Sequence, residues 1–232
     1  MDRLGPAAIL ARRLRGAAGL LKVGSRLFTA EGPRAVEKIA SLGFGVFLDL
    51  KFHDIPNTVA HSVAAAAELR GVSLLTLHAL GGADMMRAAA QAVAGKQKRP
   101  ALLGVTILTS HDAAVLRSVG ISGTPGSRGL ALAKLAKRSG LDGVVASAHE
   151  AQAIRRACGA GFLIVVPGVR PASASMNDQS RVATPAEAIR AGADYLVIGR
   201  PITGAPDPRK AALAIDEEIA GATHAGSSKA RS

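Results

Sequence analysis

The chain has 232 residues, 48% of them hydrophobic and 20% charged, which is enough apolar material for a core and excludes global disorder. A single cysteine, Cys158, excludes an internal disulfide and a Cys-based zinc site, so a cytoplasmic location is expected. The net charge of +12 suits nucleic acid, an anionic small substrate or a solvated basic surface. Lys and Arg are scattered and not interleaved with aromatics, which disfavours nucleic acid as a partner. No apolar run is long enough for a membrane span.

Short apolar runs alternate with longer Ala-rich segments along the chain, which predicts parallel strands covered by helices. A first, amphipathic helix is expected over residues 6–18. The predicted strands are Leu20–Val23, Gly45–Leu50, Ser73–His78, Ala101–Ile107, Gly143–Ala146, Phe162–Val166 and Tyr195–Ile198. The helical segments between and after them are 32–42, 57–70, 83–94, 128–139, 148–158, 185–191 and 208–220. Residues 110–127 and 167–184 are predicted as irregular polar stretches.

This pattern predicts an α/β fold in which regular βα units close into a (β/α)8 barrel, also called a TIM barrel. The barrel would form a single domain over residues 1–220, and residues 221–232 would form a disordered tail. Seven strands are found where the barrel needs eight, and the chain starts with a helix. The sequence therefore predicts a barrel lacking its first strand.

The densest functional signal is the segment FLDLKFHDIPNT, residues 47–58. Alternation along a strand places Asp49 and Lys51 on one face, and Asp54 follows in the loop. Charged groups near the carboxyl end of a buried strand persist when they are paired or functional. Lys22 ends the preceding strand and adds a second cation at the same edge. A structural ion pair remains the alternative interpretation.

Two arginines follow the last two predicted strands, Arg170 in VPGVRP and Arg200 in IGRP. Barrels often bind phosphate with the loops after their last two strands, where glycine lets the backbone approach and Arg supplies paired donors. The two turns together therefore predict a phosphate site. The histidines show no metal-ligand spacing, so no metal is expected.

The segments KVGSRLFTAEGP, FLDLKFHDIPNTV, GVTILTS and VPGVRP resemble orotidine 5′-phosphate decarboxylases over about residues 20–208. The resemblance implies a carboxy-lyase that converts OMP to UMP and CO2 in pyrimidine biosynthesis without metal or cofactor. It also implies a homodimer with shared active sites, and from the charge pattern and the lack of a long apolar run no nucleic-acid or membrane partner is expected. Within it, Lys22, Asp49, Lys51 and Asp54 match an alternating Lys-Asp-Lys-Asp array, with Lys51 as proton donor.

The resemblance further implies that Asp54, Ile55 and Thr58 reach into the neighbouring subunit's site. The residues implied to hold the pyrimidine and the phosphate are Thr109, Pro167, Arg170, Gln179, Gly199 and Arg200. The family's first strand ends in an Asp that contacts the ribose, and this Asp would fall at or before Met1. Either the given start is too late or the chain lacks the first strand, in which case a nucleotide-binding barrel impaired by that loss is one alternative. A related sugar-phosphate decarboxylase, which shares the Asp-x-Lys-x-x-Asp core, is the other.

Overall fold

The structure is a computed structural model that describes residues 1–171 and 183–228, with side chains up to Ala222 in the last helix. Seven strands follow one another in chain order, β1 to β7, and the pairs β1–β2, β2–β3, β3–β4 and β6–β7 are parallel. The chain divides into two compact units, residues 1–106 with 132–144, and the described parts of 107–131 with 145–232. Each unit is therefore described by itself. Among the described residues, no helix is both long and apolar enough to cross a membrane.

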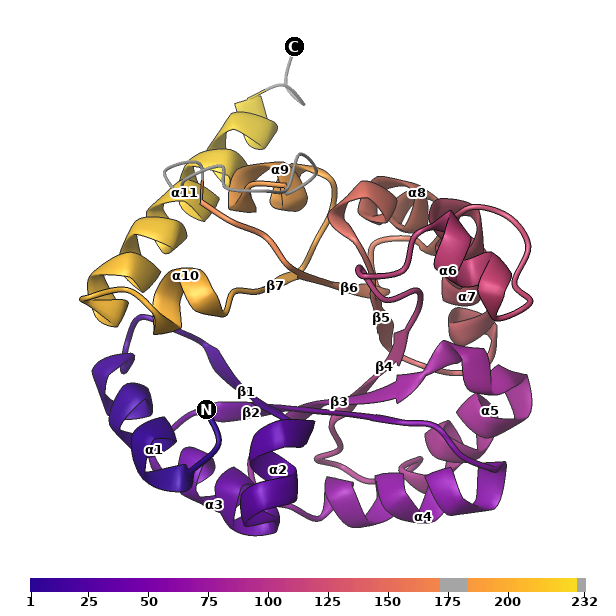
Figure 1. The fold of residues 1–232 in the computed structure, drawn as a ribbon, viewed down its shortest axis with the longest axis horizontal. Helices are drawn as coiled ribbons and strands as arrows, with labels where there is room; N and C mark the ends of the chain where they lie inside the picture. The colour runs from indigo at the N-terminus through magenta and orange to yellow at the C-terminus, as the bar shows by residue number, and fades with distance from the viewer. Residues whose placement is uncertain (172–182, 229–232) are drawn as a thin grey trace. The chain divides into compact units, whose positions relative to one another are not determined.

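The first unit is a run of βα units in which helices lie along one side of strands β1 to β4 (Figure 1). Its strands are β1 (Leu20–Gly24), β2 (Gly45–Phe52), β3 (Val72–His78) and β4 (Ala101–Val105). Its helices are α1 (Leu4–Arg13), α2 (Ser25–Glu31), α3 (Pro33–Ser41), α4 (Pro56–Ala67), the 3-10 turn η1 (Ala79–Gly81) and α5 (Gly82–Ala92). The later part of α7 (Pro125–Arg138) and the start of β5 (Gly143–Val145) also belong to it.

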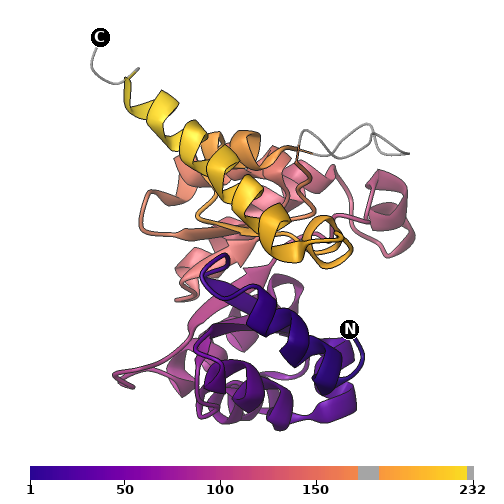
Figure 2. The ribbon, with the colours of Figure 1, turned by 90° about the vertical axis from the view of Figure 1, so that its left-hand side faces the viewer.

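The second unit contains a pair of parallel strands, β6 (Leu163–Pro167) and β7 (Tyr195–Val197). Its helices are α6 (Ala113–Ser118), α8 (Ala148–Cys158), α9 (Pro185–Arg190), α10 (Arg200–Thr203) and α11 (Pro208–Ser228), with the start of α7. The last helix, α11, packs against α9 (Figure 2). It extends beyond residue 220, where the sequence places the end of this helix.

All seven predicted strands are confirmed within a few residues, because each is an apolar run bounded by turn residues. Residues 1–19 contain α1 and no strand, as the sequence predicts. The expectation that 110–127 is irregular is wrong in part, because α6 lies within it. The Asp112 side chain caps this helix by accepting the N–H groups of Ala114 and Val115, a signal that the Gly- and Ser-rich composition conceals.

An aspartate just before β5 and another just before β7 each form two hydrogen bonds to a residue of the preceding strand, an arrangement called here a strand clamp. Asp142, just before β5, accepts the Leu102 N–H at 2.8 Å and donates its own N–H to the Leu102 carbonyl at 3.0 Å. Arg99 adds a bidentate pair to this carboxylate, with N–O distances of 2.6 and 2.7 Å. Each clamp therefore joins two neighbouring strands through one carboxylate and one backbone group.

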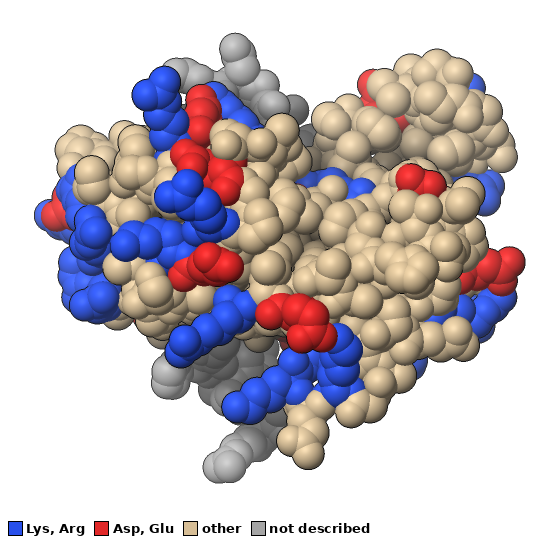
Figure 3. Space-filling model, turned by 90° about the horizontal axis from the view of Figure 1, so that it is seen from below, with Lys and Arg blue, Asp and Glu red and all other residues tan. Residues whose placement is uncertain are grey.

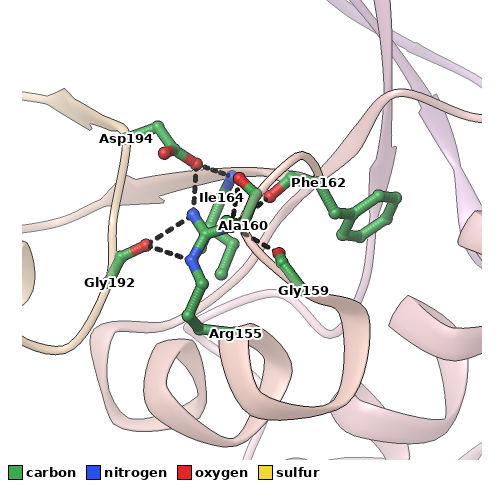
Figure 4. Close-up of polar contacts among 7 residues, drawn as sticks. All are labelled: Arg155, Gly159, Ala160, Phe162, Ile164, Gly192 and Asp194. Carbon is green, nitrogen blue, oxygen red and sulfur yellow. Dashed lines mark hydrogen bonds and ion pairs between the residues drawn. The ribbon is translucent and has the colours of Figure 1, made fainter.

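Asp194, just before β7, repeats the arrangement by accepting the Ile164 N–H at 2.7 Å and donating to the Ile164 carbonyl at 2.9 Å. Its cation is Arg155 of α8, whose guanidinium lies 2.6 Å from the carboxylate (Figure 4). The same guanidinium donates to the backbone carbonyls of Gly159, Ala160, Phe162 and Gly192. Because these groups lie at the amino end of the strands, they serve stability rather than catalysis.

Candidate functional site

The predicted charged array forms at the carboxyl ends of β1 and β2, within the first unit. The Lys22 Nζ lies 3.2 Å from Oδ2 of Asp49, and the Lys51 Nζ lies 2.8 Å from Oδ1 of the same carboxylate. Parallel pairing of β1 with β2 places Lys22 opposite Phe47, two residues before Asp49. The sequence prediction that Lys22, Asp49 and Lys51 meet at one edge is therefore confirmed.

The three side chains differ in their exposure to solvent, because the carboxylate is buried and the two ammonium groups are partly exposed. The Asp49 side chain is 11% exposed, whereas the side chains of Lys22 and Lys51 are 38% and 36% exposed. Burial raises the pKa of Asp49, but the hydrogen bond from Lys51 and the charge of Lys22 outweigh burial, so this pKa lies below its usual value. Asp49 is therefore ionised at neutral pH and anchors two ammonium groups that an incoming molecule can reach.

Lys51 has an unusual backbone, with a φ angle of +52°. It is the one non-glycine residue with positive φ in the described part of the chain. A long side chain in this region costs roughly 1–3 kcal/mol, and such strain persists where the surroundings enforce it, often at functional sites. No sequence pattern predicts this positive φ at Lys51.

Sequence reasoning missed Thr76, a fully buried residue of β3. Its Oγ1 donates to Oδ1 of Asp49 at 3.0 Å and accepts the Lys51 N–H at 2.9 Å. One signal was available, because alternation along β3 places Thr76 on the same face as Leu74 and His78. A hydroxyl in such an apolar strand needs a partner, which points to the charged residues of the neighbouring strand.

The remaining member of the motif, Asp54, lies apart from the array on the exposed loop that leads into α4. Its Oδ1 accepts the Ile55 N–H at 2.6 Å. Ile55 and Thr58 are exposed as well, and Ile55 has the largest exposed fraction, 66%, of the exposed large hydrophobic residues that the structure describes. These three side chains therefore face outward.

The residues predicted to hold pyrimidine and phosphate lie in the second unit, where β6 and β7 place two turns at the same edge. Pro167 ends β6 and pairs with Val197 of β7, so the turns that carry Arg170 and Arg200 follow neighbouring parallel strands. The Arg170 N–H donates to the Ala183 carbonyl at 3.2 Å and so joins the two described ends of the long polar loop. Gln179 lies outside the described residues.

Two other predicted contacts sit at exposed positions of this unit. Gly199 precedes α10, and its carbonyl accepts the N–H groups of Ile202 and Thr203, both at 2.9 Å. Thr109 is exposed in a turn closed by a hydrogen bond from the His111 N–H to the Leu108 carbonyl. Across the described ranges, no group of three or more His, Cys, Asp or Glu side chains is placed to hold a metal ion.

Comparison with known proteins decides the family. The model of the "Orotidine 5′-phosphate decarboxylase / HUMPS family" matches residues 6–215. The chain belongs to this family. It is 56% identical over 217 residues to an orotidine 5′-phosphate decarboxylase of Halorhodospira halophila, covering 94% of this chain and 92% of that protein. It is 54% identical over 210 residues to the enzyme of the same name from Nitrosococcus oceani, with 90% of each chain covered.

Solved structures of the orotidine 5′-phosphate decarboxylase / HUMPS family agree with this assignment. The crystal structure of orotidine 5′-phosphate decarboxylase from Lactobacillus acidophilus superposes with a TM-score of 0.82 at 38% identity, covering 94% of this chain and 95% of that one. The Pyrococcus horikoshii enzyme, at 24% identity and a TM-score of 0.77, shares the fold. The predicted α/β barrel class is therefore confirmed.

Proposed function

We propose that the protein is an orotidine 5′-phosphate decarboxylase, a carboxy-lyase that converts OMP to UMP and CO2 in pyrimidine biosynthesis. The observation that carries this proposal is the array in which one buried carboxylate, Asp49, holds the ammonium groups of Lys22 and Lys51 at 3.2 and 2.8 Å. Membership of the family and relatives of this name at more than 50% identity support the same activity. A metal or cofactor is not part of the proposal.

The array suits the chemistry of this reaction. The bond between C6 of the pyrimidine and its carboxylate breaks, CO2 leaves, and the electron pair stays on C6 as a carbanion. An ammonium group that is already in place stabilises this charge without reorganising solvent. Lys51 then gives a proton to C6 as a general acid and regains one from water. Two cations around one anion give the array a net positive charge. In this proposal that charge would face the reacting carbon.

Asp49 and Lys22 act as positioning groups in this proposal. Asp49 is ionised and hydrogen-bonded to Lys51, so it fixes the direction of the ammonium. Arg170 and Arg200, with Pro167, Gly199, Thr109 and Gln179, would hold the pyrimidine edge and the phosphate. Phosphate contacts far from C6 would supply binding energy that is used at the reacting carbon.

We infer a homodimer with shared sites from the outward-facing motif residues. Asp54, Ile55 and Thr58 are exposed, although they directly follow the strand that carries Asp49 and Lys51. A branched apolar side chain that is 66% exposed beside a carboxylate suits a protein interface. In this arrangement Asp54 would approach the array of the partner subunit.

The basic charge is assigned to a solvated surface rather than to nucleic acid. On the face drawn in Figure 3, lysine and arginine side chains alternate with acidic ones instead of forming one continuous basic field. A nucleic-acid surface would instead gather cations along one stripe. A cytoplasmic location would fit an enzyme that acts on a soluble nucleotide.

The deciding experiment is a spectrophotometric assay of OMP loss by the purified protein, with and without EDTA. We expect turnover that EDTA does not reduce. Turnover of a sugar phosphate that EDTA abolishes would instead indicate the related decarboxylase. Binding of UMP without any turnover of OMP would indicate an impaired nucleotide-binding barrel.

A further inference from the structure

The register between β2 and β3 breaks at the residues that carry the charged array. Leu48 pairs with Leu75, and the next paired residues are Phe52 and Leu77. Three residues of β2, 49 to 51, therefore stand opposite the single residue Thr76 of β3. Such a bulge leaves backbone groups of the longer strand without a ladder partner and redirects their side chains.

The Thr76 side chain replaces the missing ladder contact. Its Oγ1 accepts the Lys51 N–H at 2.9 Å, at the residue where φ is +52°. A threonine hydroxyl carries one proton and two lone pairs, so it can accept this bond while donating to Asp49, at 3.0 Å. One fully buried hydroxyl thus holds both the backbone of Lys51 and the carboxylate of Asp49.

The Asp49 carboxylate is consequently fixed by three donors. Its Oδ1 accepts from Thr76 and from the Lys51 Nζ, and its Oδ2 faces the Lys22 Nζ at 3.2 Å. Without the hydroxyl, the carboxylate loses one of the two donors to Oδ1, and the strained backbone of Lys51 loses its partner. Both changes would shift the Lys51 ammonium, which is also hydrogen-bonded to Asp49 at 2.8 Å.

We propose that Thr76 is a positioning residue for the decarboxylation, which it serves by holding the Lys51 ammonium in line with the carbon that receives the proton. The inference rests on the proposed function, because it assigns to Lys51 the proton transfer to C6. Thr76 itself is buried behind Asp49 and needs no contact with substrate. Its effect should therefore appear in turnover and not in the binding of the nucleotide.

The test compares Thr76→Val, which keeps the shape of the side chain but removes the hydroxyl, with Thr76→Ser, which keeps the hydroxyl. Misplacing a reacting group by about 1 Å costs on the order of 100-fold in rate, so we expect kcat of Thr76→Val to fall roughly 10- to 100-fold. The dissociation constant of UMP, measured by calorimetry, should stay within about twofold, because an interaction used only in the transition state does not alter ground-state binding. Thr76→Ser should restore most of kcat.

Ser139→Ala is the matched control. The Ser139 hydroxyl belongs to the same unit and is buried, with no hydrogen-bond partner among the described residues. Its removal should leave both kcat and UMP affinity at the values of the unaltered protein. Thermal unfolding followed by circular dichroism shows whether each variant is folded.

Thr76→Cys keeps the test decisive if Thr76→Val does not fold, because a thiol is a weaker donor and acceptor than a hydroxyl. We then expect kcat of Thr76→Ser to exceed that of Thr76→Cys. Full kcat in a folded Thr76→Val, equal kcat in the Ser and Cys variants, or a loss confined to UMP binding would each overturn the inference. Failure of the unaltered protein to convert OMP would refute the proposed function itself, and the inference would fall with it.

Discussion

The Nζ of Lys51 lies 2.8 Å from Oδ1 of Asp49, so the proposed proton donor is held by a carboxylate two residues earlier on the same strand. Residues two apart on a regular strand share a face. The bulge at residues 49–51, with the positive φ of Lys51, bends the strand and directs the long Lys51 side chain back toward the carboxylate. The pair therefore joins a strained backbone to a charged contact.

Replacement of Lys51 by alanine should remove nearly all turnover of OMP while the protein remains folded. The ammonium that stabilises the carbanion and protonates C6 is lost, but the Lys51 side chain is more than one-third exposed and Lys22 still pairs with Asp49. Initial rates in the spectrophotometric assay measure the effect, with Lys134→Ala, an exposed lysine of α7, as control. Substantial residual activity in Lys51→Ala would contradict the assigned role.

A mixture of two inactive variants should recover activity if Asp54 completes the partner's site. In a hybrid dimer of Lys51→Ala with Asp54→Ala, one site carries both defects and the other carries neither. Random pairing in a twofold dimer then predicts about a quarter of the unaltered activity. Rates after subunit exchange, with analytical ultracentrifugation for the oligomeric state, provide the measurement. An inactive mixture of dimers proven to exchange would show that the two residues serve the same subunit's site.

Replacement of Arg200 by alanine should mainly weaken substrate binding. Arg200 is exposed at the start of α10, and a lost hydrogen bond to a phosphate is worth about 1.5–3 kcal/mol, or roughly a tenfold or larger rise in KM. Steady-state kinetics with OMP provide the measurement, and Arg190→Ala on the exposed side of α9 is the control. An unchanged KM would remove Arg200 from the phosphate site.

Replacement of Arg155 by alanine should destabilise the protein by on the order of 2–4 kcal/mol, because several charge-assisted hydrogen bonds are lost and backbone carbonyls lose their donor. Arg155→Lys should not restore stability, since a single ammonium cannot reproduce the fork that contacts Asp194 and four carbonyls (Figure 4). Urea unfolding measures both variants. Equal stability of the Lys variant and the unaltered protein would show that charge alone suffices.

Asp142 should contribute stability that depends on pH. Burial raises the pKa of Asp142, but the hydrogen bonds from Arg99 and from the Leu102 N–H outweigh burial, so this pKa lies below its usual value. The unfolded chain then binds more protons than the native state near pH 4, and the contribution of Asp142 is lost as pH falls through its lowered pKa. Asp142→Asn should therefore be less stable at pH 7, by a margin that shrinks on acidification.

Urea unfolding at pH 7 and at acid pH tests this expectation. Asp84→Asn is the control, because Asp84 forms an ion pair with Arg87 on the surface of α5, with its side chain 83% exposed. Exposed pairs of this kind contribute little. A stability margin of Asp142→Asn that stays constant with pH would show that the carboxylate acts through its shape and not its charge.

The strands and the charged array could be predicted because both depend on local pattern. Apolar runs between turn residues mark strands, and the two-residue spacing of Asp49 and Lys51 follows from strand alternation. The bonds from Asp142 to β4 and from Asp194 to β6 were not predicted, although the segments Gly-Leu-Asp142 and Gly-Ala-Asp194 share one pattern. In both, a glycine with positive φ, 86° at Gly140 and 101° at Gly192, ends a helix just before the aspartate.

The bond between Thr76 and the Lys51 backbone could not be predicted, because it depends on the register between two strands that no single segment encodes. A regular pairing would leave the Lys51 N–H to the backbone of β3, and only the observed bulge assigns it to a side chain. The left-handed backbone of Lys51 has the same origin. The conformation of Lys51 and its bond to Thr76 therefore depend on the long-range pairing of β2 with β3, which local periodicity does not encode.

At position 51 the backbone conformation favours glycine, whereas the proposed reaction needs an amine. Glycine adopts a φ of +52° without strain, but glycine carries no amine. Glycine at position 51 would relieve the backbone strain but would also remove one of the donors to the buried Asp49, so the strain and the ion pair act on stability in opposite directions. Selection for turnover would retain lysine whichever of the two is larger, because the proposed proton donor is the amine.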